Sequence, residues 1–470
     1  MLTLQHVLKA LLGHGIGELD FKLPEAFIDS RSVSESGLFF ALRGERTDGH
    51  LYVDDAFAGG ASLAVIDRPI QSAYPIVDLR AAEPKLPERA PFSLLTDDSL
   101  LALQKIASYW RSQFDIKVIG ITGSVGKSST KELTANVLSK RLVTLKNPGN
   151  LNNEIGMPLS ILKLTEEHEV AVLEMGFYVP GEIKLLCDIA RPQIGIVTNI
   201  GTVHAERAGS IDVIAQGKAE LVQALPPAPE GVAILNYDDE RVLAMAAKTK
   251  ARVFTYGLCP QADLWADQVE SMGLEGIRCR IHYQGDSFYV TAPLIGRHSV
   301  YTMLRSAAAA LSLGFSWDWI FYALKTSNLQ LRIATTKTAS GALLIDDTYN
   351  ASPDSTLAAL NLLDDLSGRK VAVLGDMLEL GQYEDDGHQR VGIRAAQVAD
   401  EIVLVGQRSL KTQAAAIESG FPPEKIHWFP DQSGAARYLQ DTLKEHDIAL
   451  IKGSHAMHMD LIVASLEIVS

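Results

Sequence analysis

The segment from Gly120 to Thr130, which reads GITGSVGKSST, constrains this chain more than any other feature of its sequence. A run of β-forming residues, Ile116–Thr122, leads into it, and a helical pattern, Ser129–Leu138, follows it. A strand, a glycine-rich loop and a helix in this order form a phosphate-binding unit of parallel α/β folds. The segment therefore predicts a nucleotide-binding domain; the alternative is a glycine-rich turn with an incidental lysine.

The residue types inside the loop fit the chemistry of binding a nucleoside triphosphate. Gly123 and Gly126 let the main chain approach phosphate oxygens, Lys127 can neutralise their charge, and the hydroxyl of Ser128 can ligate Mg²⁺. Only two residues separate the glycines, whereas the general motif has a longer spacing. The predicted ATP-binding residues of the loop are Gly123, Ser124, Gly126, Lys127, Ser128 and Ser129.

Polar residues also follow the next two predicted strands. Glu174 comes after Val170–Leu173, and His204 lies in the loop after Ile194–Thr198. Because ligands collect at the carboxyl ends of parallel strands, both side chains are candidate Mg²⁺ ligands. Each residue taken alone could instead cap a helix or hold a loop. Lys218, on a helical segment, is either a site residue or a solvated surface lysine, and the sequence leaves both open.

The C-terminal segment repeats the alternation of strands and helices. Asp347 and Asn350 follow its first predicted strand, and Lys452 closes its last. Acidic residues at strand ends can bind ribose hydroxyls, Mg²⁺ or a substrate amine, and a lysine can meet a carboxylate. These residues predict a second half-site, although any one of them could simply cap a helix. The predicted strands are Ala342–Ile345, Lys370–Leu374, Glu401–Val405 and Asp447–Ile451.

The chain of 470 residues is longer than one hydrophobic core usually supports. Residues 82–92, rich in proline and charge, are typical of a linker, and polar residues within Lys325–Lys337 suggest a second joint. We expect an α/β protein whose parallel sheets are covered by helices on both faces. Its three predicted domains are an N-terminal domain (1–112), a central phosphate-loop, ATPase-like domain (113–326) and a C-terminal Rossmann-like domain (327–470).

Composition excludes several other classes of protein. A formal charge of −14 argues against a nucleic-acid binder. Cys187, Cys259 and Cys279 form neither a disulfide framework nor a zinc motif, and we expect all three to be buried. Met1–Asp20 lacks the pattern of a signal peptide, and the apolar stretch Ser306–Leu324 is polar enough to predict a packed helix rather than a membrane span. We expect a reduced, cytoplasmic setting without membrane insertion.

The motifs together resemble the Mur ligase family, and the match runs over nearly the whole chain. The central segments that carry the resemblance are GITGSVGKSSTKEL, NPGNLNNEIGMPLSIL, AVLEMGFYVPGEI and NIGTVHAERAGSIDVIAQGKAEL. Residues 28–62 resemble the uridine-nucleotide-binding domain shared by the last two ligases of the series. DDTYNASPDS and VLGDMLELG resemble the D-alanyl-D-alanine-adding branch, and the DNPR sequence of the diamino-acid-adding branch is absent.

The resemblance implies a reaction. ATP would phosphorylate the terminal carboxylate of UDP-N-acetylmuramoyl-tripeptide (UDP-MurNAc-tripeptide) to an acyl phosphate, which the amine of D-alanyl-D-alanine would attack. Closure of the C-terminal domain would keep water from the activated acyl group. The implied cofactors are ATP and Mg²⁺, the implied partners are these small molecules, and the expected state is a monomer.

The resemblance also assigns roles to residues. Lys127 would contact the β- and γ-phosphates, Ser128 and Glu174 would hold one Mg²⁺, and His204 would serve a second. Lys218 matches the position that carries a carbamate formed with CO₂, which turns a cation into a metal-orienting anion. Lys127, His204 and Lys218 are therefore the predicted catalytic residues.

Further binding residues come from the N-terminal domain and from the C-terminal one. Arg332 would reach the γ-phosphate from the hinge, and Asp347 would meet the nucleotide from the C-terminal domain. His50 could equally be a structural hydrogen-bonder. The candidate substrate-binding residues are Ser30, Arg31, Thr47, Asp48, His50, Asn350 and Lys452.

Four positions depart from the family pattern. Ser299 and Thr302 replace the two asparagines of the GxHNxxN motif, Tyr178 replaces another asparagine, and His455 replaces an arginine. The first two changes bear on ATP affinity, because hydroxyls make fewer hydrogen bonds than amides. The alternatives to the assigned reaction are a ligase of this superfamily with another carboxylate or amine and a catalytically silent nucleotide-binding protein. The third residue of the tripeptide is not determined.

Overall fold

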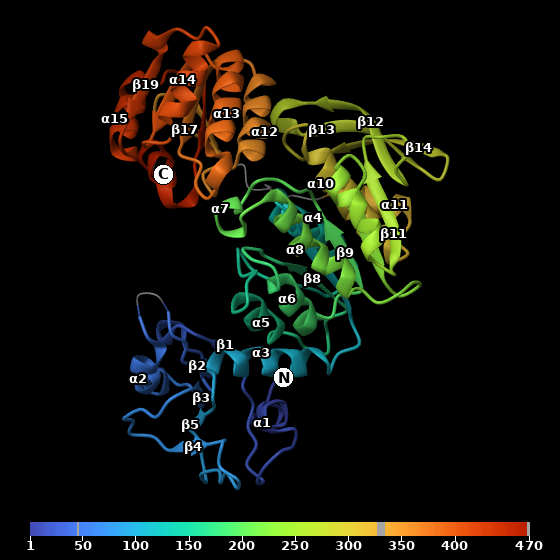
Figure 1. Cartoon of the computed structure of the whole chain (residues 1–470), viewed down its shortest axis with the longest axis vertical. Coiled ribbons are helices and arrows are strands. Elements are labelled where there is room, and N and C mark those ends of the chain that lie inside the picture. The colour runs from blue at the N-terminus through green and yellow to red at the C-terminus, as the bar shows by residue number, and fades with distance from the viewer. Residues whose placement is uncertain (45–46, 327–333, 468–470) are drawn as a thin grey trace. The chain divides into compact units, whose positions relative to one another are not determined.

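The computed structural model describes residues 1–44, 47–326 and 334–467. It is a mixed α/β structure with three sheets, in agreement with the predicted fold class (Figure 1). The chain divides into two compact units. The first contains Met1–Gly120, Arg141–Gly176 and Gly181–Ile194, and the second contains Ile121–Lys140, Phe177–Pro180 and Gly195–Ser470.

A five-stranded parallel sheet with the order β1-β2-β3-β5-β4 lies in the first unit. Residues 82–91 connect two strands of this sheet, so the prediction of a linker between domains at 82–92 was wrong. The elements are α1 (Leu4–Leu12), β1 (Ala26–Phe27), β2 (Leu38–Phe40), α2 (Val53–Ala58), β3 (Leu63–Ile66), β4 (Ile76–Asp78), β5 (Phe92–Leu95) and α3 (Ser99–Arg111).

The first unit also contains β7 (Thr144–Lys146), α5 (Gly156–Ile161), β8 (Val170–Glu174) and α6 (Glu182–Ala190). Helix α3 packs against α5 and α6. At the end of α3, the buried guanidinium of Arg111 donates hydrogen bonds to three main-chain carbonyls. These carbonyls belong to Ala190, Phe114 and Ile116, so Arg111 ties helix ends and a strand start together.

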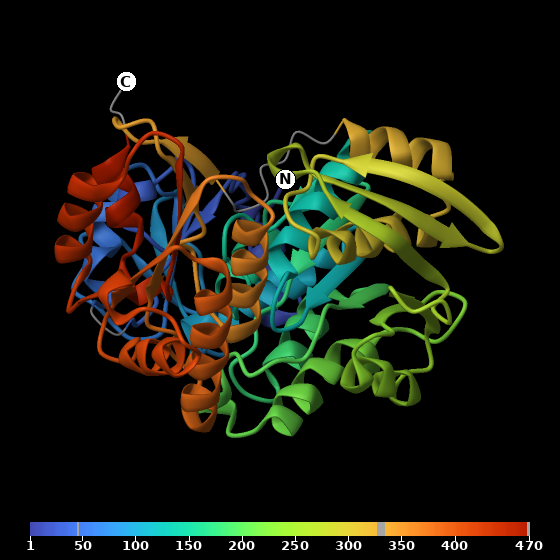
Figure 2. The ribbon, with the colours of Figure 1, turned by 90° about the horizontal axis from the view of Figure 1, so that it is seen from above.

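A nine-stranded sheet has the order β14-β13-β12-β11-β10-β9-β6-β8-β7. The pairs β7–β8, β10–β11 and β11–β12 are parallel, as predicted, whereas β12–β13 and β13–β14 are antiparallel, which the sequence did not predict. The yellow strands β12–β14 form a curved ribbon in Figure 2. The strands not yet given are β6 (Lys117–Thr122), β9 (Ile194–Val197), β10 (Val232–Asn236), β11 (Arg252–Gly257), β12 (Leu264–Ser271), β13 (Ile277–Tyr283) and β14 (Asp286–Ala292).

Among the helices of the second unit that precede the C-terminal sheet, α4 and α10 pack against each other. The stretch Ser306–Leu324 was predicted as one helix, but it spans two. The break comes at Gly314, whose φ of +85° ends the first helix in the left-handed region. The helices are α4 (Lys127–Ser139), α7 (Ala205–Ala208), α8 (Ile211–Ala224), α9 (Glu240–Leu243), α10 (Ser299–Ser312) and α11 (Trp317–Lys325).

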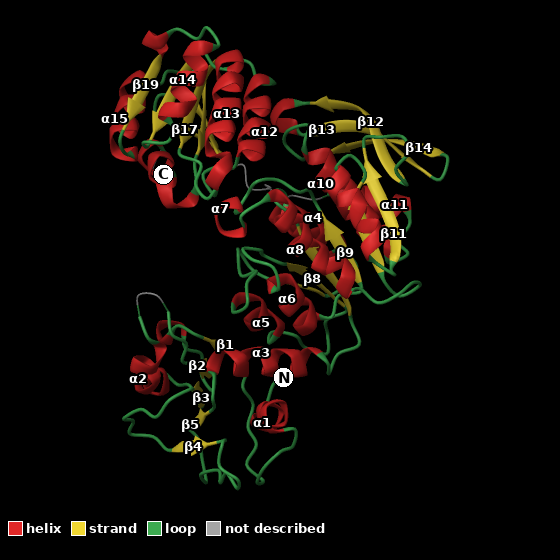
Figure 3. Ribbon diagram, in the orientation of Figure 1, coloured by secondary structure: helices red, strands yellow, loops and turns green. Residues whose placement is uncertain are grey.

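The C-terminal sheet has the order β15-β16-β20-β17-β18-β19, and every pair except β15–β16 is parallel. Two separate apolar cores, one containing Leu360 and Leu374 and the other Val373 and Leu439, show that helices cover both faces (Figure 3). The elements are β15 (Ala334–Lys337), β16 (Leu343–Asp346), α12 (Pro353–Asp364), β17 (Arg369–Gly375), α13 (Glu384–Val398), β18 (Glu401–Val405), α14 (Leu410–Glu418), β19 (Ile426–Phe429), α15 (Gln432–Thr442), β20 (Asp447–Lys452) and α16 (Asp460–Leu466).

In the part of the chain that the structure describes, no helix is both long and apolar enough to span a membrane. None of the three cysteines, which all lie within the described residues, forms a disulfide. Cys187 and Cys279 are buried, as expected, whereas Cys259 is partly exposed and donates to the side chain of Gln261. The expectation of burial was therefore wrong for Cys259.

Candidate active site

The phosphate loop adopts a conformation that its glycines make possible. Gly126 has a φ of +82°, and Gly123 has a φ of +141°. A Cβ on Gly123 would lie 1.8 Å from the hydroxyl oxygen of Thr198, which no other residue could accommodate without moving that strand end. Helix α4 then begins at Lys127, so its free N–H groups face the loop.

Residues at the end of β9 hold the loop in place. The side-chain oxygen of Asn199 accepts the N–H of Val125 at 2.8 Å, and its carbonyl accepts the N–H of Ser124 at 2.9 Å. The hydroxyl of Thr198 donates to the carbonyl of Val125 at 2.7 Å. The hydroxyl of Ser124 joins Gly201 through both its donor and its acceptor. The loop backbone is thus preorganised by hydrogen bonds to both side chains and main chain.

The polar side chains of the loop lie as a phosphate site requires. Lys127 directs its ammonium group back over the loop and donates to the carbonyls of Gly123 at 3.0 Å and Ser124 at 3.3 Å. Ser128, on the first turn of α4, is buried, and Ser129 beside it is half-buried. A phosphate can replace the carbonyl contacts of Lys127, because a charged acceptor binds an ammonium group more strongly.

His204 sits at the start of α7 with a φ of +66°, and its side chain is 16% exposed. Its Nδ1 lies 2.6 Å from a carboxylate oxygen of Glu379, and its ring makes an edge contact with Tyr178. Burial and the charge of Lys127 lower the pKa of His204, although Glu379 opposes the shift. A neutral ring that donates Nδ1–H to Glu379 has its Nε2 lone pair available to a metal ion.

Lys218 is 1% exposed, so the structure excludes the surface lysine that the sequence left open. Its ammonium nitrogen lies 4.7 Å from the centre of the Phe177 ring, a cation–π distance. The preceding Gly217 makes this packing possible, because a Cβ there would lie 2.0 Å from the same ring. Lys218 and Lys127 both act electrostatically on His204, which places the three predicted catalytic residues in one neighbourhood.

Glu174 lies in the first unit at the end of β8 and is 2% exposed. Asn152 donates to its carboxylate at 2.9 Å, and Asn147 accepts its main-chain N–H at 2.9 Å. Asn152 therefore orients this carboxylate, and Asn147 holds the main chain that carries it. Within the described residues, no group of three or more His, Cys, Asp or Glu side chains forms a metal cluster.

The predicted uridine-site residues lie at the carboxyl edge of the N-terminal sheet. Ser30 is half-buried, Thr47 is exposed, and Arg31 is exposed and pairs with Asp29. Burial would raise the pKa of Asp48, but hydrogen bonds from the main chain and ring of His50 and from Arg68 lower it to about 2.

The buried ring of His50 uses both of its nitrogens inside the protein. Nδ1 contacts Asp48 at 2.7 Å, while Nε2 accepts the main-chain N–H of Asp67 at 3.2 Å. These bonds match the structural role that the sequence left open for His50. Contact of His50 with a substrate stays a prediction.

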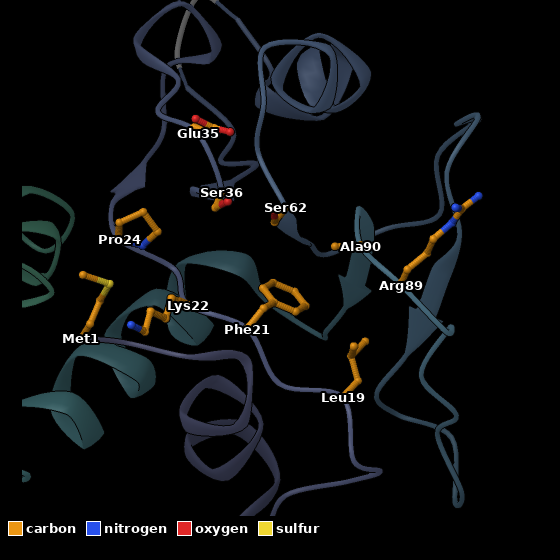
Figure 4. A pocket seen from close by; sticks show the side chains of 10 residues that line it. All are labelled: Met1, Leu19, Phe21, Lys22, Pro24, Glu35, Ser36, Ser62, Arg89 and Ala90. Carbon is orange, nitrogen blue, oxygen red and sulfur yellow. The ribbon is translucent and has the colours of Figure 1, made fainter.

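A cavity of about 620 Å³ opens at the opposite edge of the same sheet (Figure 4). Phe21, Lys22 and Arg89 line it together with Ser36 and Ser62. These residues precede the strands, whereas the predicted uridine-site residues follow them. The cavity is therefore separate from the predicted substrate-binding edge.

In the C-terminal domain the structure joins three predicted residues. The buried ammonium group of Lys452 lies 2.6 Å from a carboxylate oxygen of Asp347 and 2.8 Å from the carbonyl of Asn350. The main-chain N–H of Asp347 in turn bonds the end of β20. Arg332 lies outside the described residues.

Sequence reasoning missed two residues beside the predicted ones. Glu379 contacts His204 from the C-terminal domain, and Arg305 lies against Gly126 from α10. The motif VLGDMLELG contains Glu379, so its position next to a signature was the available signal. Arg305 gave no local signal, because its contact with the loop depends on how α10 packs against α4.

Comparison with known proteins agrees with this geometry. A family model described as the Mur ligase middle domain matches residues 121–310. A model of the Mur ligase glutamate ligase domain matches 331–455, and one of the Mur ligase family catalytic domain matches 26–110.

Relatives match along nearly the whole chain. The UDP-N-acetylmuramoyl-tripeptide–D-alanyl-D-alanine ligase of Synechocystis is 35% identical, with 95% of this chain and 92% of the relative covered. The enzyme of the same name from Escherichia coli is 33% identical, with 96% of both covered.

Solved structures extend the likeness to the fold. MurF from Acinetobacter baumannii superposes with a TM-score of 0.84 at 32% identity, with 98% of both chains covered. MurF from Thermotoga maritima in complex with ADP gives 0.79 at 26% identity, with 94% of this chain and 96% of the other covered. The chain is an ATP-dependent ligase that belongs to the Mur ligase family.

Proposed function

We propose that this enzyme joins D-alanyl-D-alanine to UDP-MurNAc-tripeptide, with ATP activating the tripeptide carboxylate as an acyl phosphate. The observation that carries the proposal is the preorganised phosphate loop, with Lys127, His204 and the buried Lys218 in one neighbourhood. In such a site Lys127 and the N-terminus of α4 supply positive charge where a phosphoryl group is transferred. The relatives that span nearly the whole chain carry this substrate pair in their names.

The donor atoms present fit Mg²⁺. We assign Ser128 and Glu174 to one ion and His204 to a second. Mg²⁺ takes few protein ligands, mostly oxygens such as those of Ser128 and Glu174, and completes its shell with water and substrate phosphates. Bound Mg²⁺ would neutralise charge on the phosphates.

The other roles follow from position. Lys127 stabilises the transferred phosphate, and the neutral ring of His204 is oriented by Glu379. Lys218 is the proposed site of the carbamate, since its burial near His204 fits a residue that acts on a metal centre. Arg332 and Asp347 are the proposed additional contacts of the nucleotide.

Substrate contacts are assigned at both ends of the chain. Ser30, Arg31, Thr47 and Asp48 are the proposed uridine-nucleotide contacts, with His50 supporting Asp48. Asn350 and Lys452 are the proposed contacts of the amine acceptor. The proposed location is the cytoplasm. The proposed oligomeric state is a monomer, which sedimentation of the pure protein tests.

The assigned reaction is tested by phosphate release from Mg-ATP in the presence of UDP-MurNAc-tripeptide, with D-alanyl-D-alanine added or withheld. Release that requires both substrates, together with the pentapeptide product by mass spectrometry, is the expected result. Tripeptides that differ in their third residue then define the preferred carboxylate substrate.

Two outcomes contradict the assigned reaction in different ways. Release with a different amine would keep the ligase mechanism and change the specificity. If no substrate pair gives phosphate release, although ADP binds, the chain is a silent nucleotide-binding protein.

A further inference from the structure

Arg305 carries a buried charge at the phosphate loop. Its side chain lies on α10, and the residue is 5% exposed. A Cβ built on Gly126 would lie 3.2 Å from both terminal nitrogens of this guanidinium. The arginine therefore packs directly on the turn from which α4 begins.

The neighbours of Arg305 satisfy hydrogen bonds but do not balance its charge. Nε donates to the carbonyl of Tyr301 at 2.9 Å, and Nη2 donates to the hydroxyl of Thr302 at 3.1 Å. The ring of Tyr256 lies 5.8 Å from its central carbon. Among the residues that the structure describes, no carboxylate forms an ion pair with Arg305. Burial lowers the pKa of this guanidinium, but an arginine has so high a pKa that it stays charged.

Other positive charges near Arg305 make its buried charge more destabilising when no ligand is bound. The N-terminus of α4 already carries positive partial charge, and Lys127 adds a full charge on the first residue of that helix. A bound polyphosphate is the ligand that offsets all three contributions together.

The two hydroxyl residues that replace the family asparagines both bond locally. Ser299 donates to the carbonyl of Ile295 at 2.6 Å, and Thr302 accepts from Arg305. Because these two side chains are short and uncharged, the guanidinium of Arg305 is the charged hydrogen-bond donor that α10 places at the phosphate loop.

We propose that Arg305 is a positioning residue of the nucleotide site, which braces the Gly126 turn and raises the affinity of this chain for nucleoside polyphosphates. The inference rests on the proposed use of ATP. It assigns to this chain a compensation for its two missing asparagines.

The test measures the thermal stability of the full chain with and without Mg-ADP, together with steady-state kinetics. In Arg305→Met the melting temperature without ligand should stay level or rise, because a buried charge without a carboxylate partner is removed. The stabilisation by ADP should fall, and KM for ATP should rise about tenfold, as expected for loss of a charged contact. KM for the other two substrates should not change.

Arg111→Met is the matched control. Arg111 is also a buried arginine without an ion pair among the described residues, but three carbonyls depend on it. Its replacement should lower stability without ligand and leave the ADP-induced shift intact. Arg305→Lys keeps the charge and should recover part of the stabilisation by ADP. If Arg305→Met does not fold, Arg305→Lys takes its place in the comparison with Arg111→Met.

An unchanged ADP shift and an unchanged KM for ATP in the Arg305 variants would overturn the proposal. A loss of ligand-free stability like that of Arg111→Met, with nucleotide affinity unaltered, would assign Arg305 a structural role only. If the wild-type chain itself is not stabilised by ADP, the proposed use of ATP fails, and this outcome is distinct from a failure confined to Arg305.

Discussion

The phosphate loop and the carboxyl edge of the N-terminal sheet both collect charged side chains, yet they hold them in opposite ways. At the N-terminal edge, Asp48 binds His50 and Arg68, while the Arg31 side chain is 88% exposed. At the loop, uncharged groups such as the side chain of Asn199 fix the backbone, and Lys218 is buried against an aromatic ring.

The difference indicates how each edge responds to a ligand. A substrate that binds the N-terminal edge must exchange partners with charges that are already paired, so each contact there adds little net free energy. At the loop the backbone is already fixed, and an entering phosphate has only to replace the carbonyl contacts of Lys127. A displaced group there therefore costs a large part of the rate. Substitutions at the loop should therefore reduce kcat, and those at the N-terminal edge should raise KM.

The largest effect is expected at Lys218. Lys218→Ala and Lys218→Met should both reduce kcat by about a thousandfold or more, because each removes the charged group from the site. Methionine keeps the contact with Phe177, and the melting temperature of this variant checks that it is folded. Pentapeptide formation measures activity. Full activity in either variant would remove Lys218 from the catalytic machinery, and intact-mass spectrometry under mild conditions tests for the carbamate separately.

A smaller effect is expected when the loop backbone is displaced. In Gly123→Ala, the new methyl would overlap Thr198, so the loop must shift and kcat should fall about a hundredfold. The control is Gly209→Ala, because Gly209 also has a positive φ, of +90°, but a Cβ there meets nothing within 4 Å. Equal kinetic losses in the two variants would show that backbone strain, not the position of the loop, sets the rate.

The sequence predicted the phosphate loop because its determinants are local. Strand, glycines and lysine lie within one short segment, and β6 and α4 follow the predicted bounds closely. The strands β16, β17, β18 and β20 were also predicted within one or two residues.

Features set by contacts far apart in sequence could not be predicted in this way. Lys218 lies on a helix whose pattern fits a surface position equally well, and only the packing of Phe177 on Gly217 buries it. The antiparallel β12–β14 ribbon was missed because its strands carry many polar residues on a partly exposed face. Arg305 reaches the loop only after α10 and α4 have packed, so no motif contains both partners.

The smallest effect is expected at the N-terminal edge. There Asp48→Asn should raise KM for UDP-MurNAc-tripeptide roughly threefold and leave kcat unchanged, as for a partly exposed ion pair. The pKa of Asp48 is lowered to about 2 in the folded protein, so its charge stabilises the folded state above the unfolded pKa of about 4. This contribution should decline as the pH falls from about 4 towards 2, and the difference in melting temperature between wild type and Asp48→Asn should decline with it. A difference that stays constant over this range would show that Asp48 acts through packing, and a large loss of kcat would break the contrast between the two edges.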